Sequence, residues 1–140
     1  MSRASLEKFK YFMDIQTRWN DNDMYGHVNN AVYYTWFDSL VNNWLIETGV
    51  LDPLNSAQIG LVVDTGCQYF APLSYPQSVR AGLCVAHIGN SSVRYEIGLF
   101  KDDDERACAQ GHFVHVYVDA SSRKPKPFGD KFRTALETLV

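Results

Sequence analysis

The sequence predicts an α+β fold in which a curved antiparallel sheet wraps around one long central helix. The first reason is a single stripe of apolar residues at helical spacing between Asn30 and Thr48. The second is that the chain after this helix consists of alternating segments joined by short connections, as antiparallel hairpins require. Strands and helices do not alternate, which argues against βαβ units. With no internal repeat or linker, residues 1–140 are expected to form a single domain.

The first elements are a strand at Phe9–Thr17, a polar loop at Arg18–Val28 and the helix at Asn30–Thr48. Asparagine is a strong N-cap, so the Asn29-Asn30 pair marks the start of the helix. The apolar stripe consists of Val32, Tyr33, Trp36, Phe37, Leu40, Val41, Trp44 and Leu45. Gly49 ends the helix, because glycine readily adopts the left-handed conformation that follows a last helical turn. One helix of about 28 Å facing one sheet indicates that the sheet curls around it.

Four more strands and a short terminal helix are expected in the rest of the chain. The strands are Leu61–Phe70, Ser78–Ile88, Ser92–Lys101 and Arg106–Asp119, and the terminal helix lies within Phe128–Val140. Two strands alternate, with Val79, Ala81, Leu83 and Val85 on one face of the first, and Val93, Tyr95, Ile97 and Leu99 on one face of the second.

Composition excludes several classes of protein. The chain is 46% hydrophobic with a net charge of −3, so a disordered chain is not expected. The basic residues form no stripe interleaved with aromatics, which argues against nucleic-acid binding. No apolar run approaches the roughly 20 residues that span a bilayer, and the N-terminus has no apolar signal segment. A cytoplasmic protein with three reduced cysteines, Cys67, Cys84 and Cys108, is therefore expected.

The polar loop and the start of the helix, from Arg18 to Asn30, hold the densest cluster of reactive side chains. A helix N-terminus offers free backbone N–H groups and a positive dipole end, which stabilise a developing oxyanion. A nearby carboxylate attacks a carbonyl or activates a water. Asp23 lies seven residues before Asn30, with Gly26 between them to allow a sharp turn. The alternative for such a loop is simple helix capping.

The stretch D-N-D-M-Y-G-H-V-N-N-A-V-Y, from Asp21 to Tyr33, closely resembles the motif of hotdog-fold thioesterases, with the 4-hydroxybenzoyl-CoA thioesterase-like family as the nearest group. The similarity extends from about residue 10 to 128. It implies a hotdog fold and a homodimer, often paired into a homotetramer, whose sheets join edge to edge with the active site at the dimer interface. It assigns Asp23 as the catalytic carboxylate and the backbone N–H of Asn30 as the group that polarises the thioester carbonyl.

Four further residues are candidates for the site. His27 either assists catalysis or orients the loop, and Tyr33, one turn into the helix, is a candidate for the acyl pocket. Ser92 and Arg94 share one side of their strand and are candidates for the CoA phosphates. These two are considered because the nearby turn has Gly89-Asn90 where some relatives carry the basic residues that hold the CoA phosphates. The alternative for Arg94 is a solvated surface residue. Asp38 also departs from the family, in which many members have a helix glutamate at this position.

No cofactor and no metal are expected. Asp21, Asp23 and His27 lack a further paired ligand motif, and Asp21 is expected to bond loop N–H groups. His112 and His115, three apart on a strand, face opposite sides and do not easily share a metal.

The predicted function is hydrolysis of an acyl-CoA thioester. The alternatives are an acyl carrier protein thioesterase and a non-catalytic acyl-CoA-binding module, with a hydratase or dehydratase ranked lower. The sequence contains no GxSxG elbow, which leaves serine-hydrolase chemistry unsupported.

Overall fold

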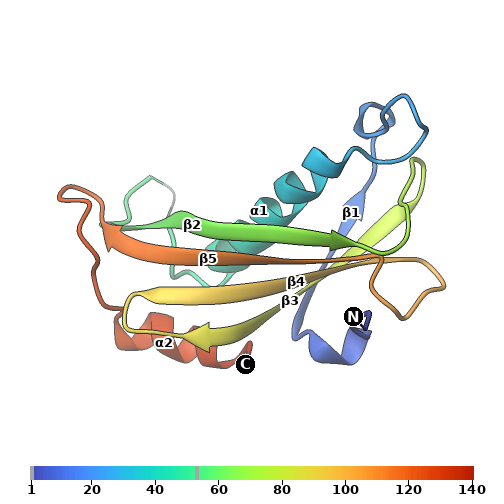
Figure 1. The fold of residues 1–140 in the computed structure, drawn as a ribbon. Helices are drawn as coiled ribbons and strands as arrows, with labels where there is room; N and C mark the ends of the chain where they lie inside the picture. Colours follow the sequence, from blue (N-terminus) through green and yellow to red (C-terminus); the bar gives the residue numbers. More distant parts are fainter. Residues whose placement is uncertain (1, 53) are drawn as a thin grey trace.

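A computed structural model describes residues 2–52 and 54–140 of the chain. Five strands form one antiparallel sheet in the order β1-β3-β4-β5-β2, and the long helix α1 (Asn30–Glu47) crosses one face of it (Figure 1). The strands are β1 (Tyr11–Gln16), β2 (Gln58–Tyr69), β3 (Ser78–Ile88), β4 (Ser92–Lys101) and β5 (Ala109–Asp119). The predicted α+β hotdog architecture is confirmed.

The apolar stripe of α1 packs against the inward-facing residues of the sheet. Seven of the eight predicted stripe residues are buried, and Val32 packs against the cluster from its edge. The alternating residues predicted to share one face of β3 and one face of β4 all belong to the same core. The spacing of apolar residues in the sequence therefore identified both the helix side and the sheet side of this interface.

The ends of α1 form as the sequence predicts. The side chain of Asn29 caps the helix by accepting a hydrogen bond of 2.9 Å from the backbone N–H of Ala31. Thr48 is the C-cap, and Gly49 follows with a φ of +75°, the left-handed conformation expected of it.

The first strand is shorter than predicted, because Phe9 precedes it and packs on the outer face of the sheet. Phe9 is buried there with Cys84, Phe100 and Ala107. Gly82 and Gly98 make this possible, since a Cβ on either would lie within 2.8 Å of the Phe9 side chain.

The bounds of β2 and β5 also differ from the prediction, and β2 ends at Tyr69 and not at Phe70. β2 begins at Gln58, three residues earlier than expected, because its pairing with β5 extends to Asp119. β5 begins at Ala109 and not at Arg106, because the preceding residues pair with the N-terminal segment instead. Arg106 forms a bridge with Ser5, and the N–H of Ala107 donates to the carbonyl of Ala4.

The terminal helix α2 (Asp130–Glu137) lies within the predicted segment and covers one end of the sheet beside β3 (Figure 1). Phe132, Leu136 and Leu139 enter the main core, and the N–H of Val85 donates to the carbonyl of Leu139. No helix among the described residues has the length and apolar content needed to cross a membrane. All three cysteines are free thiols, as predicted.

The strand β2 lies at the edge of the sheet and pairs with β5 only. Three successive apolar residues near its middle, Leu61, Val62 and Val63, are exposed, and the pairing register shifts between Val62 and Asp64. An exposed apolar edge of this length invites pairing with another strand.

Candidate functional site

The polar loop is held in shape by Asp21, whose side chain is 1% exposed. Its carboxylate accepts a hydrogen bond of 2.7 Å from the backbone N–H of Arg18 and pairs with the Arg18 guanidinium at 3.0 Å. Its carbonyl also accepts from the N–H of Asn29 at 2.8 Å, which ties the loop to the start of α1. Asp21 therefore has the structural role that the sequence predicted.

Asp23 occupies the tip of the same loop and is only half-buried. One carboxylate oxygen accepts a hydrogen bond of 2.9 Å from the N–H of Tyr25. Its backbone N–H donates to the carbonyl of His27, and the N–H of Gly26, at a φ of +82°, donates back to the carbonyl of Asp23. Within the described chain the second carboxylate oxygen, Oδ2, has no hydrogen-bond partner, so it is available to a substrate or a water.

The N-terminus of α1 lies directly after this turn and offers one unused donor. The N–H of Ala31 is capped by Asn29, and the N–H of Val32 donates to the carbonyl of Asn29. The backbone N–H of Asn30 donates to no residue within 2–52 and 54–140. A free N–H at the positive end of a helix dipole is suited to an oxygen that carries negative charge.

An open cavity of about 300 Å³ lies beside the loop. It is lined by His27, Val28, Tyr33, Tyr69, Phe70, Ala71 and Pro72. The rings of Tyr33 and Tyr69 meet edge to face at 4.9 Å, and the Tyr69 hydroxyl donates to the carbonyl of Asn30 at 3.1 Å. Burial raises the pKa of Tyr33 to about 12, so its hydroxyl stays protonated at neutral pH.

The structure thus brings Asp23, His27, Asn30 and Tyr33 to one end of the sheet. His27 is exposed at the rim of the cavity, and Tyr33 is buried at its wall. Tyr69 is a wall residue that the sequence did not single out. Tyr69 is at the end of β2, and it reaches the site only because the fold places this strand end beside the start of α1.

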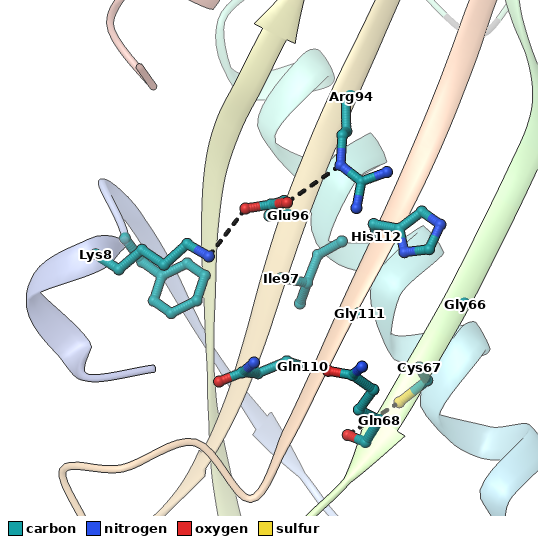
Figure 2. Close-up of a pocket in the computed structure, with 11 residues that line it drawn as sticks. Lys8, Gly66, Cys67, Gln68, Arg94, Glu96, Ile97, Gln110, Gly111 and His112 are labelled. Atoms are coloured by element: carbon teal, nitrogen blue, oxygen red, sulfur yellow. Dashed lines mark hydrogen bonds and ion pairs between the residues drawn. The ribbon is translucent and has the colours of Figure 1, made fainter. Parts of the chain in front are cut away.

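Ser92 and Arg94 lie elsewhere, near the start of β4 and on the outer face of the sheet. Because Lys101, at the other end of β4, pairs with Val79 beside the site loop, Ser92 is about 30 Å along the strand from that end. Arg94 lines an outer groove of about 400 Å³ with Lys8 and His112 (Figure 2). One chain alone does not bring these two candidates to the Asp23 loop.

Glu96 lies between two cations in this groove. It pairs with Lys8 at 2.9 Å and with the Nε of Arg94 at 3.1 Å (Figure 2). Partial burial alone would raise its pKa, but the hydrogen bonds from Lys8 and Arg94 lower it. Arg94 is therefore not a free surface cation, although its terminal nitrogens bond to no other described residue.

His112 and His115 face opposite sides of β5, as predicted. His112 bonds to Asp64 at 2.9 Å on the outer face, and His115 is buried among aromatic rings on the inner face. Among the described residues there is no group of three or more His, Cys, Asp or Glu side chains placed to hold a metal ion.

Comparison with known proteins shows which family this chain resembles. The family model of the thioesterase-like superfamily matches residues 17–136. The PA5185 protein of Pseudomonas aeruginosa strain PAO1 is 50% identical, covers 98% of this chain and 96% of its own, and has a TM-score of 0.94. The PA2801 protein of the same species is 28% identical over 91% of this chain and 98% of its own, with a TM-score of 0.85.

A more distant structure has the same fold. Slr0204, a 1,4-dihydroxy-2-naphthoyl-CoA thioesterase from Synechocystis, is 17% identical, with a TM-score of 0.82 over 92% of this chain and 96% of its own. All three structural comparisons extend over at least 91% of this chain, and the family model includes the site loop within residues 17–136.

Proposed function

Because this chain belongs to the thioesterase-like superfamily, we propose that it hydrolyses acyl-coenzyme A thioesters, with Asp23 as the catalytic carboxylate. The observation that carries the proposal is that the site loop and the helix start that follows it each offer one unused group. Oδ2 of Asp23 and the backbone N–H of Asn30 both lack partners among the described residues. A carboxylate and an oxyanion donor are the two parts that thioester hydrolysis requires.

In this proposal the thioester carbonyl oxygen accepts a hydrogen bond from the N–H of Asn30. The helix dipole then stabilises the negative charge that develops on that oxygen during attack. Asp23 either takes a proton from an attacking water or attacks the carbonyl carbon itself. In both routes the bond from carbon to sulfur breaks and CoA leaves as a thiol after gaining a proton. In the first route the attacking water supplies the hydroxyl of the released acid. In the second route the acyl group is left on Asp23 as an anhydride, which a water then hydrolyses to release the acid and restore the carboxylate. His27 at the rim is placed to assist proton transfer.

We further propose that two copies join through β2. An antiparallel pairing along the whole strand sets Gln58 opposite the partner subunit's Tyr69 and covers the exposed Leu61–Val63 segment. In each subunit, the Asp23 loop lies at the end of the sheet where β2 finishes. Since the pairing is antiparallel, this end lies beside the opposite end of the partner's sheet, where the partner's β2 begins. Ser92 lies at that other end, because it pairs with Val116 near the end of β5.

This arrangement supports a role for Ser92 and Arg94 in holding CoA. Ser92 lies two strands from β2, which is roughly 10 Å at the spacing of strands in a sheet. In the dimer, these residues of one subunit are near the Asp23 loop of the other, whereas within one chain they are far apart. The terminal nitrogens of Arg94 suit a phosphate oxygen. Slr0204, which shares the fold, is itself a CoA thioesterase.

The test is an assay of hydrolysis with short, medium, long and aromatic acyl-CoAs, in which the release of free thiol is measured. The wild-type protein is expected to turn over at least one class, and Asp23→Asn is expected to lower kcat by at least ~10²-fold. Asparagine keeps the oxygen that accepts from Tyr25, so the loop should persist, as circular dichroism can verify. Asp14→Asn, at an exposed position of β1, is the matched control.

Three outcomes contradict the proposal. Near-normal turnover by Asp23→Asn places catalysis on another group. Binding of acyl-CoA without turnover by the wild-type protein indicates a binding module. Hydrolysis of acyl carrier protein substrates alone retains the chemistry but contradicts CoA as the carrier.

A further inference from the structure

A small cavity of about 70 Å³ lies between the middle of α1 and the strands β2 and β5. Its lining includes Asp38 of α1, Gly60 of β2, and His115 and Tyr117 of β5. Gly60 keeps the space open, because a Cβ there would lie 2.8 Å from the Tyr117 ring and 3.2 Å from Nδ1 of His115. The cavity contains none of the predicted site residues.

His115 is the unusual member of this group. Its side chain is 4% exposed, and its Nε2 is buried with no hydrogen-bond partner among the described residues. Buried side-chain polar atoms are nearly always hydrogen-bonded, because an unpaired one loses its hydration without compensation. Because His115 is one of the residues that line the cavity, a polar group bound there would supply the partner that this nitrogen lacks.

The neighbouring hydroxyls determine whether Nε2 is a donor or an acceptor. The hydroxyls of Tyr95 and Tyr117 lie 2.8 Å apart, and the Tyr117 hydroxyl lies 3.2 Å from Nδ1 of His115. Tyr95 is fully buried, and its hydroxyl has no other partner within the described chain. The hydroxyl proton of Tyr95 therefore makes a hydrogen bond only if Tyr95 donates to Tyr117. Tyr117 then donates its own proton to Nδ1 of His115, so the imidazole proton is on Nε2.

The charge state of His115 agrees with this assignment. Burial lowers the pKa of His115 to about 4, so the ring is neutral near pH 7. A neutral ring with Nδ1 as acceptor has a single N–H, and that N–H is on Nε2. The complementary ligand atom is an oxygen with a free lone pair, as in a hydroxyl or carbonyl group.

We propose that the Nε2–H of His115 donates to an oxygen atom of the acyl group, away from the thioester, when the thioester is bound at the Asp23 loop of the partner subunit. The protein then favours acyl groups that carry a hydroxyl or carbonyl oxygen over plain hydrocarbon ones. This inference rests on the proposed thioesterase function and on the β2-paired dimer. His115 acts as a specificity residue and has no part in bond breaking.

Geometry favours the partner's loop over the loop of the same chain. Asp38, on the cavity wall, is eight residues after Asn30, which is about 12 Å along α1. In the dimer, the whole-strand pairing of β2 places Gly60 opposite the partner subunit's Cys67, two residues before the partner's Tyr69. Tyr69 lines the cavity beside the Asp23 loop, so in the dimer the two cavities are about two residues apart along β2, or roughly 7 Å, which is shorter than the separation along α1.

The first experiment compares matched acyl-CoA pairs that differ only by an oxygen, such as benzoyl against each hydroxybenzoyl isomer, and hexanoyl against hydroxyhexanoyl and oxohexanoyl isomers. Wild-type protein is expected to show at least one pair in which kcat/KM favours the oxygenated substrate by about tenfold or more. His115→Phe, which keeps a ring but removes the N–H, is expected to abolish this preference while retaining hydrolysis of the plain partner. Equal kcat/KM within every pair overturns the inference.

The second experiment mixes subunits. Asp23→Asn and His115→Phe proteins are unfolded together, refolded together and assayed on the best pair. In a mixed dimer, one site combines the intact Asp23 of one chain with the intact His115 of the other. The oxygen preference should therefore return, although neither parent protein shows it. If the mixture shows no oxygen preference, as His115→Phe alone does, then His115 does not act across the interface.

The tautomer provides a readout that does not depend on folding of the variant. Nitrogen NMR of ¹⁵N-histidine-labelled wild-type protein is expected to show His115 as the Nε2–H tautomer at pH 7. An Nδ1–H tautomer overturns the assignment of Nε2 as a donor. Failure of the proposed function itself looks different, because then no acyl-CoA is hydrolysed or Asp23→Asn remains active.

Discussion

Two aspartates in the same loop, two residues apart, have different surroundings. The carboxylate of Asp21 is buried and bonded to both the backbone and the guanidinium of Arg18. The carboxylate of Asp23 makes one hydrogen bond and keeps Oδ2 unpaired among the described residues. A carboxylate whose lone pairs are already occupied is a poor base or nucleophile. This difference supports the proposal that Asp23 carries out the chemistry, whereas Asp21 fixes the shape of the loop.

The pKa of His115 predicts how stability depends on pH. Because the folded value is about 4, below the usual value of about 6.5, the unfolded chain binds this proton more readily than the folded chain. The free energy of unfolding should therefore fall as the pH drops below about 6.5, with a total loss of about 3 kcal/mol by pH 4. Urea unfolding at successive pH values measures this loss.

The matched variant for that experiment is His115→Phe, which removes the titrating group. Its free energy of unfolding should vary less between pH 6.5 and 4 than that of the wild-type protein. The same pH dependence in both proteins would show that His115 is not the group responsible.

At the scale of elements, α1 lies very close to the sheet at Gly111. A Cβ at this position would overlap a ring carbon of Phe37 and would lie 3.0 Å from the carbonyl oxygen of Gly66. Phe37 is fully buried, so its ring has little room to move. Glycine at this point in β5 sets the distance between helix and sheet, and therefore the position of the helix N-terminus that the site uses.

Gly111→Ala should consequently destabilise the protein by about 1–3 kcal/mol, the usual cost of overpacking a core. The midpoint of urea unfolding measures the change. Combining Gly111→Ala with Phe37→Leu frees space at the contact, so the double variant should lose less stability than the sum of the two single variants. Additive losses would mean that the contact with Phe37 is not the cause.

At the scale of the whole molecule, the open edge of β2 is the surface through which we propose that copies associate. The sheet has two edges, β1 and β2, and β2 is the longer strand, with the exposed apolar segment near its middle. Pairing through β2 is also what brings Ser92, Arg94 and His115 of one copy toward the Asp23 loop of another. The proposed site is therefore complete only in the assembly.

The chain is expected to be a dimer or tetramer at micromolar concentration, as measured by light scattering. Val63→Lys places a charge in the proposed interface and should shift the protein toward monomers and lower kcat/KM together. Ser121→Lys, in an exposed turn, adds the same charge elsewhere and serves as the control. A wild-type monomer, or an active Val63→Lys monomer, would contradict an active site shared between subunits.

The amino-acid sequence by itself determined the features that depend on neighbouring residues. The helical stripe, the caps at Asn29 and Gly49, the alternation in β3 and β4 and the role of Asp21 were all predicted and are confirmed. The loop motif indicated the superfamily, which the match over residues 17–136 confirms. Helix periodicity, strand alternation and capping repeat over a few residues, so they can be recognised before the chain folds.

Only the tertiary structure decided which distant residues meet. It placed Phe9 over Gly82 and Gly98, moved the start of β5 to Ala109, and joined Tyr95 on β4 to Tyr117 and His115 on β5. It also placed Ser92 and Arg94 far from Asp23 along one chain. These contacts depend on strand order and register, which join segments separated by many residues and leave no local pattern in the sequence.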